Sequence, residues 1–93
     1  MKNKNLKNIR IKLDKIDVRL LRIIKERSIL VEQVVKLKKT KKEIVDKKRI
    51  KFILKEIRKK SIKAGIDPMI TSGIWKEMIN CFIKYEYKNF KKK

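Results

Sequence analysis

The longest uninterrupted helical pattern of the chain is LKNIRIKLDKIDVRLLRIIKERSILVEQVVKLK, residues 6–38. Its apolar residues recur at steps of three and four, which is the spacing of one face of a helix. Neither glycine nor proline interrupts this pattern before Thr40. The pattern predicts a single helix over about 5–40, a rod roughly 50 Å long at about 1.5 Å per residue.

Such a rod is longer than a globule of 93 residues is wide, so its apolar stripe needs other helices along its whole length. A chain this short also buries little surface by itself. Both arguments indicate that a second chain covers the stripe.

Two further helices follow the long one. Asp46 has the side chain of an N-cap, and the apolar pattern after it predicts a helix over 46–64. The polar segment 39–42 before it is expected to be a loop. We find no strand alternation and no internal repeat, so these elements belong to an all-α protein.

Gly65 ends the second helix, and Asp67-Pro68 begins a third over 67–90. The whole chain, residues 1–93, is expected to form one domain, with residues 91–93 as a frayed basic tail.

Composition excludes several kinds of chemistry. The chain has no histidine, one cysteine and two glycines, so it has no imidazole base, no internal disulfide and no glycine-rich phosphate loop. We therefore expect no metal and no cofactor. No apolar run approaches the ~20 residues that span a membrane, and no signal core follows the basic N-terminus. We expect a soluble, cytoplasmic protein.

The net charge of +20 indicates anionic partners. Nucleic acid is the first candidate, but the 24 lysines are spread along the chain and are not interleaved with aromatic residues on one element. Lysine, isoleucine and asparagine are also favoured by A/T-rich coding sequences. We therefore expect no specific nucleic-acid partner, and a basic nucleic-acid-binding dimer remains the alternative from another class.

Charged residues interrupt the apolar seams. Arg27 and Lys38 lie on the stripe of the long helix, about 20° apart in direction and ~16 Å apart along the axis. Arg49 shares a face with apolar residues of the second helix, and Glu86 does so on the third. Lone charges are rarely buried. The pattern therefore indicates a pocket for a small molecule with two carboxylates; the alternative is that these residues lie at the stripe edges and pair with nearby acids.

Arg10 precedes Arg27 by 17 residues and projects about 100° away from it on the same helix. It therefore does not join the same pocket easily, but it could reach the pocket of a dimer partner.

These positions resemble the all-α chorismate mutase family and its relative isochorismate-pyruvate lyase. The resemblance covers residues 6–90 and is most specific in the first helix. It is carried by the segments Arg10-x-x-Leu13-Asp14-x-Ile16-Asp17-x-x-Leu20-Leu21-x-Ile23-Ile24-x-x-Arg27, Lys38, Val45-Asp46-x-x-Arg49, Gly65-Ile66-Asp67-Pro68 and Phe82-Ile83-Lys84-Tyr85-Glu86.

The resemblance implies an intertwined homodimer of three-helix protomers that rearranges chorismate to prephenate in aromatic amino acid biosynthesis. It implies that Lys38 and Glu86 flank the ether oxygen of the substrate. It also implies that Arg27 and the partner chain's Arg10 bind the carboxylates, while Arg49 and the backbone near Asp46 line the ring.

Two positions depart from the best-known bacterial mutases. Ile50 stands where those enzymes carry a glutamate for the ring hydroxyl, and the lyase is apolar there, so isochorismate-pyruvate lyase activity remains open. Glu86 stands where the bacterial enzymes carry a glutamine. Some fungal mutases also have a glutamate at this position. An ionised carboxylate would repel the ether oxygen, so Glu86 would have to be protonated during the reaction.

Overall fold

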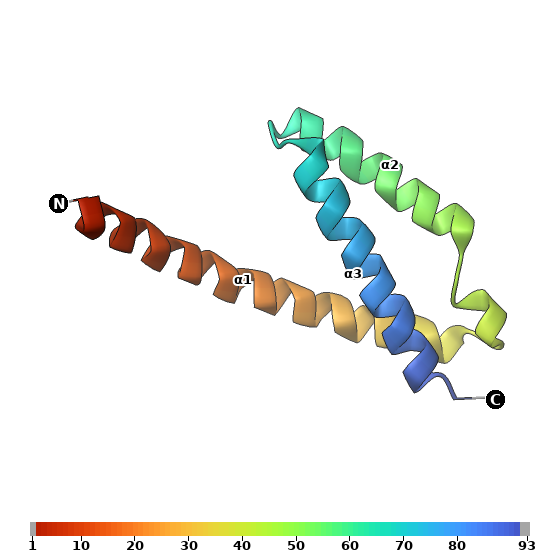
Figure 1. Cartoon of the computed structure of the whole chain (residues 1–93). Coiled ribbons are helices and arrows are strands. Elements are labelled where there is room, and N and C mark those ends of the chain that lie inside the picture. Colours follow the sequence, from red (N-terminus) through yellow and green to blue (C-terminus); the bar gives the residue numbers. More distant parts are fainter. Residues whose placement is uncertain (1, 92–93) are drawn as a thin grey trace. The chain divides into compact units, whose positions relative to one another are not determined.

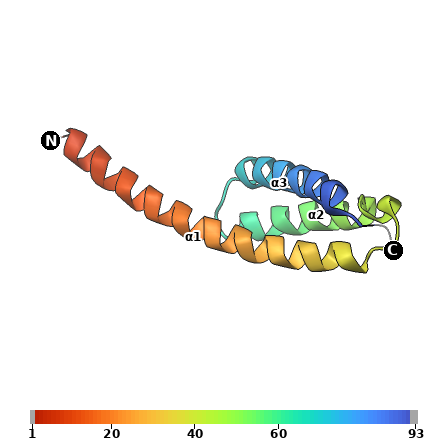
Figure 2. The same cartoon turned by 90° about the horizontal axis from the view of Figure 1, so that it is seen from below.

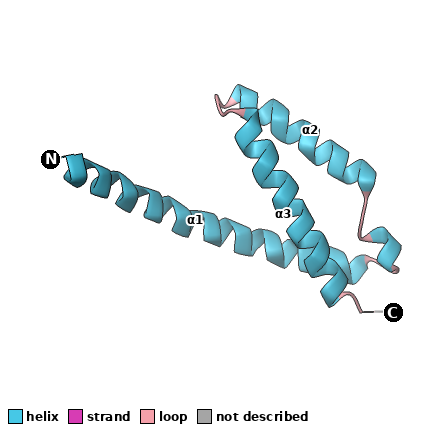
Figure 3. Ribbon diagram, viewed as in Figure 1, coloured by secondary structure: helices cyan, strands magenta, loops and turns pink. Residues whose placement is uncertain are grey.

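The computed structural model describes residues 2–91, which form three α-helices and one short 3-10 helix (Figure 1; Figure 3). These are α1 (Lys2–Leu37), η1 (Lys41–Glu43), α2 (Lys47–Lys63) and α3 (Pro68–Asn89). There is no strand within residues 2–91, so the all-α prediction is confirmed. None of the helices in this part of the chain carries an apolar stretch long enough to cross a lipid bilayer.

The chain divides into two compact units, Met1–Leu30 and Val31–Lys93. The first unit is the N-terminal part of α1. The second unit contains the end of α1 together with η1, α2 and α3. Of the tail expected over 91–93, Lys91 is exposed and the last two residues lie outside the described residues.

α1 ends at Leu37, three residues before the expected end, although no glycine or proline is present to stop it. After Leu37, two backbone N–H groups donate outside the i to i−4 hydrogen-bond pattern of the helix. The N–H of Lys38 donates to the Val35 carbonyl, 3.2 Å away, which tightens the last turn. The N–H of Lys39 donates to a carboxylate oxygen of Glu43 at 3.1 Å. The segment expected to be a plain loop therefore contains η1.

α2 and α3 form a hairpin whose ends are set by local sequence (Figure 1; Figure 2). Asp46 caps α2 by accepting from the Arg49 N–H at 3.0 Å, and Asp67 caps α3 by accepting from the Met69 N–H at 2.9 Å. Both predicted N-caps are thereby confirmed.

The turn between α2 and α3 begins with Gly65, whose φ of 74° is the left-handed conformation that favours glycine. The N–H of Ile66 donates to the Ser61 carbonyl at 2.8 Å, and the N–H of Gly65 donates to the Ile62 carbonyl at 3.1 Å. These two bonds satisfy carbonyls that the end of α2 would otherwise leave free, as the predicted glycine stop requires.

The interior of the second unit is small. Val35, Ile44 and Ile79 are its buried apolar residues. A buried polar contact joins the two hairpin helices, because the hydroxyl oxygens of Ser61 and Thr71 lie 2.7 Å apart. Each hydroxyl also has a backbone carbonyl within reach, so both hydroxyl protons have an acceptor although the pair is buried.

Candidate active site

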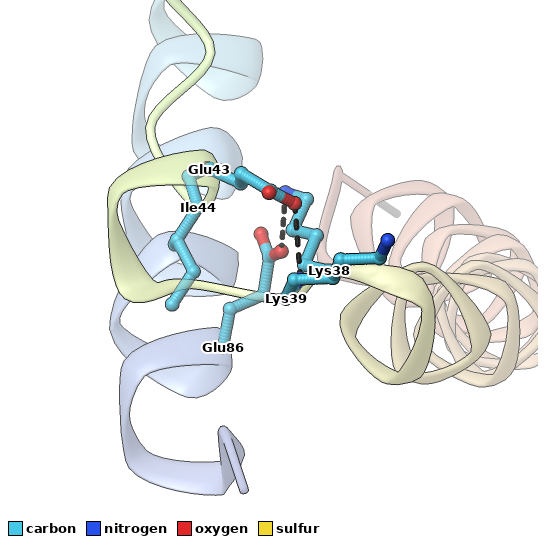
Figure 4. A network of polar contacts seen from close by, with 5 residues as sticks. All are labelled: Lys38, Lys39, Glu43, Ile44 and Glu86. Carbon is cyan, nitrogen blue, oxygen red and sulfur yellow. Dashed lines mark hydrogen bonds and ion pairs between the residues drawn. The ribbon is translucent and has the colours of Figure 1, made fainter. Parts of the chain in front are cut away.

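Lys38 and Glu86 are 48 residues apart in sequence and meet in the second unit (Figure 4). The Nζ atom of Lys38 lies 3.0 Å from Oε1 of Glu86, and the side chains are only 17% and 10% exposed. Charged groups this sheltered from water interact strongly and are costly to bury without a partner. The two groups that the resemblance implies for the ether oxygen are thus brought together.

A third group contacts the Lys38 ammonium. The carbonyl oxygen of Ile44 accepts a hydrogen bond from Nζ at 3.4 Å, and Ile44 as a residue is 3% exposed. Lys38 follows the last residue of α1, so its ammonium is positioned by the turn after α1 and by α3. The helix therefore ends one residue before Lys38. The helical spacing from Arg27 no longer fixes the direction of the Lys38 side chain.

The turn that carries Lys38 is closed by Glu43 (Figure 4). Its carboxylate accepts from the Lys39 N–H, and its own N–H donates to the Thr40 carbonyl at 3.2 Å. The N–H of Ile44 then donates to the Lys41 carbonyl at 3.1 Å. This ring of bonds holds the Ile44 carbonyl on the side of the turn where Lys38 lies.

Glu43 and Ile44 are not among the residues that the sequence pattern predicted for the site. The available signal was weak: Ile44 and Val45 are an apolar pair within a run of charged residues, which indicates an anchored turn. The role of a backbone carbonyl leaves no mark in the residue type.

The three remaining predicted residues of the second unit lie at the start of α2. Asp46 is the N-cap, Arg49 is exposed, and Ile50 is partly buried. The Arg49 guanidinium carbon lies 5.5 Å from the centre of the Phe52 ring, a cation–π distance. Exposure of Arg49 agrees with the alternative that it sits at the edge of the apolar stripe.

Arg10 and Arg27 belong to the first unit, and the other predicted residues belong to the second. Arg10 is exposed and lines a shallow hollow on α1 with Leu6 and Asp14, whereas Arg27 is partly buried. Both lie on α1, so about 25 Å of helix axis separates them and they face different directions. One small molecule cannot contact both from the same stretch of this helix.

The three helices carry a sheltered lysine–glutamate pair and further cationic side chains, an arrangement of the class that can hold a small anion by charge and position. Residues 9–87 match the family Chorismate mutase type II. The match covers most of the chain, and the protein belongs to this family, as the resemblance predicted. Searches of curated proteins and of solved structures found no match.

Proposed function

We propose that the protein is a chorismate mutase that rearranges chorismate to prephenate in aromatic amino acid biosynthesis. Membership of the Chorismate mutase type II family supports a mutase-like activity in general. The observation that carries the specific proposal is the sheltered Lys38–Glu86 pair, which offers an ammonium and a carboxyl group side by side.

The reaction suits this chain. Chorismate rearranges within one molecule: the ether C–O bond breaks while a C–C bond forms, without a nucleophile, metal or proton transfer. A catalyst therefore has to hold the enolpyruvyl arm over the ring and stabilise the negative charge that grows on the ether oxygen. A chain without histidine can supply both through cations.

In this proposal the Lys38 ammonium donates to the ether oxygen and the protonated Glu86 donates to the same atom. Without substrate the two side chains bind each other at 3.0 Å, so the ether oxygen takes the place that each occupies for the other. The Ile44 carbonyl holds the ammonium in position during this exchange.

The substrate's two carboxylates need cationic partners. Arg27 and the Arg10 of a second chain are proposed for them, because a guanidinium binds a carboxylate through two parallel hydrogen bonds. Arg49 and the backbone at Asp46 are proposed to line the ring, with Ile50 beside them. No cofactor has a part in this scheme. We also propose that the enzyme acts in the cytoplasm, since its one cysteine allows no internal disulfide.

Ile50 favours a second candidate, isochorismate-pyruvate lyase on the same scaffold. It is a partly buried apolar residue directly after Arg49, where a mutase of the best-known bacterial type has a glutamate. An apolar side chain offers no hydrogen bond to the ring hydroxyl, so it weakens the preference for chorismate.

Proton NMR of the purified protein with each substrate separates the two candidates. We expect prephenate to appear from chorismate, with Ile50 a tolerated substitution. Pyruvate and salicylate from isochorismate alone would establish the lyase and contradict the mutase. Silence from both substrates would reject both enzymes and favour the basic surface as the functional feature.

We further propose that two chains form the intertwined homodimer. The first unit supports this, because the large apolar residues on one face of its helix remain exposed: Ile9 is 56% exposed, Leu13 51% and Ile23 58%. An apolar stripe that spans several turns and faces water is typical of an interface.

Mixing two inactive variants tests whether Arg10 acts across this interface. Arg10→Ala and Lys38→Ala chains, refolded together, are expected to recover about a quarter of the wild-type activity, because about half of randomly formed dimers are mixed and each mixed dimer has one intact site. The measurement is prephenate formation by the mixture and by each variant alone.

A mixture of Lys38→Ala with Glu86→Ala is the matched control. Both residues belong to the same chain's site, so no mixed dimer contains a complete site and no recovery is expected. Failure of the first mixture to recover, with mixed dimers present by native mass spectrometry, would contradict the partner role of Arg10.

A further inference from the structure

A hollow of about 540 Å³ opens beside the candidate catalytic lysine. It is lined by residues of η1, the segment after it and the first turn of α2, and includes Lys38 and Asp46. The other lining residues are Lys42, Glu43, Val45, Lys47 and Lys48. All of these except Lys38 are exposed, so the hollow opens from solvent beside the partly buried Lys38.

The charges of this hollow are predominantly positive. Four lysines line it against two acids, and both acids have local roles: Glu43 accepts from the Lys39 N–H, and Asp46 accepts from the Arg49 N–H. Lys39 and Lys41, both exposed, add further positive charge along the same turn. The electrostatic potential at the mouth of the hollow is therefore positive.

The placement of Lys47 and Lys48 is unfavourable for the helix that carries them. They occupy the first turn of α2, which contains no acidic residue. The helix dipole is positive at this end, so cations there cost stability, commonly about 0.3–1 kcal/mol each. Residues that destabilise their own helix end and gain no visible packing are often found where function requires them.

We propose that Lys42, Lys47 and Lys48 form a capture surface that concentrates the dianionic substrate at the mouth of the Lys38 hollow and raises the rate at which it enters. This inference rests on the proposed function. The three lysines act at a distance and do not touch the bound substrate. Clefts lined by one sign of charge raise the local concentration of opposite charges and increase on-rates by about 10–10³-fold.

The experiment measures kcat/KM for chorismate as a function of ionic strength. In the wild type we expect kcat/KM to fall about tenfold between ~20 mM and ~500 mM salt, because screening shortens the reach of the lysines. The triple variant Lys42→Gln, Lys47→Gln, Lys48→Gln is expected to lose about five- to tenfold at low salt and to converge with the wild type at high salt. Its kcat should change far less than its kcat/KM.

A second triple variant provides the matched control. Lys60→Gln, Lys63→Gln and Lys76→Gln remove the same charge from exposed positions of the same unit. Lys60 lies about 18 Å along α2 from Lys48, beyond the ~8 Å screening length at physiological salt. We expect this variant to keep most of the wild-type kcat/KM at low salt and a similar salt dependence.

Equal losses in the two triple variants, or a wild-type kcat/KM that does not respond to salt, would overturn the capture surface and leave the mutase intact. Absence of any turnover of chorismate by the wild type would overturn the proposed function and this inference with it. Circular dichroism verifies that the exposed substitutions leave the helices folded.

Discussion

Lys38→Ala is expected to lower kcat/KM for chorismate by about 10²–10³-fold, the usual effect of removing one donor to a developing oxyanion. The Lys38 side chain is 17% exposed, and its ammonium is held by Glu86 at 3.0 Å and by the Ile44 carbonyl at 3.4 Å. No other lysine is hydrogen-bonded to Glu86 within the described residues, so no neighbour replaces it. Steady-state kinetics of prephenate formation measure the loss.

Lys39→Ala is the matched control, because it removes the same side chain one position along the turn. Only the backbone N–H of Lys39 takes part in the hydrogen bond to Glu43, and its side chain extends away from that bond in Figure 4. We expect Lys39→Ala to retain activity within about twofold, as is usual for exposed substitutions.

Removal of Lys38 also leaves the carboxylate of Glu86 without its ionic partner, which destabilises the fold. Thermal unfolding followed by circular dichroism therefore accompanies the kinetics. Lys38→Arg keeps a cation at this position, and we expect it to restore stability more fully than activity. A folded Lys38→Ala protein with wild-type kcat/KM would exclude Lys38 from the reaction.

The second large effect is a dependence on pH that belongs to Glu86. The proposal requires this residue to carry a proton while the ether oxygen gains charge. Activity of the wild type is therefore expected to fall as pH rises and Glu86 loses its proton, by about tenfold for each further pH unit. Glu86→Gln keeps a donor at all pH values, so its profile is expected to be flat and to exceed the wild type by about 100-fold two units above the fall.

The ion pair with Lys38 gives this prediction its physical content. In the substrate-free protein the Lys38 ammonium lies 3.0 Å from the Glu86 carboxyl group, so the two groups proposed for the ether oxygen contact each other directly. Glu77→Gln, an exposed position on the same helix, is the matched control and is expected to keep the wild-type profile. A wild-type rate that is independent of pH would contradict the role of Glu86.

Local sequence predicted the helices well, because the signals that begin and end a helix act over a few residues. The N-caps Asp46 and Asp67 and the stop at Gly65 are each satisfied by backbone groups no more than five residues away. The end of α1 was harder to predict, since the carboxylate that binds the Lys39 amide comes from Glu43, in a segment expected to be a plain loop.

The candidate site was only partly predictable. Charged residues in the apolar seams identified Lys38 and Glu86 as residues that need partners, but pattern alone also allowed Lys38 to extend into solvent. Arg49 shares a face with apolar residues of α2, and this pattern indicated a pocket. In the structure Arg49 is exposed, and its guanidinium lies over the Phe52 ring.

The all-α class, the caps of α2 and α3, the turn between them and the family could all be predicted from the residues alone, because they depend on residue types and short spacings. The contacts of the Lys38 ammonium with Glu86 and the Ile44 carbonyl, and the lysine-lined hollow beside Lys38, became visible with the folded chain. Those contacts join the end of α1, η1 and α3, and no local rule relates groups that lie 48 residues apart. They form because burial leaves a charged side chain stable only where a partner of opposite charge is also brought out of water.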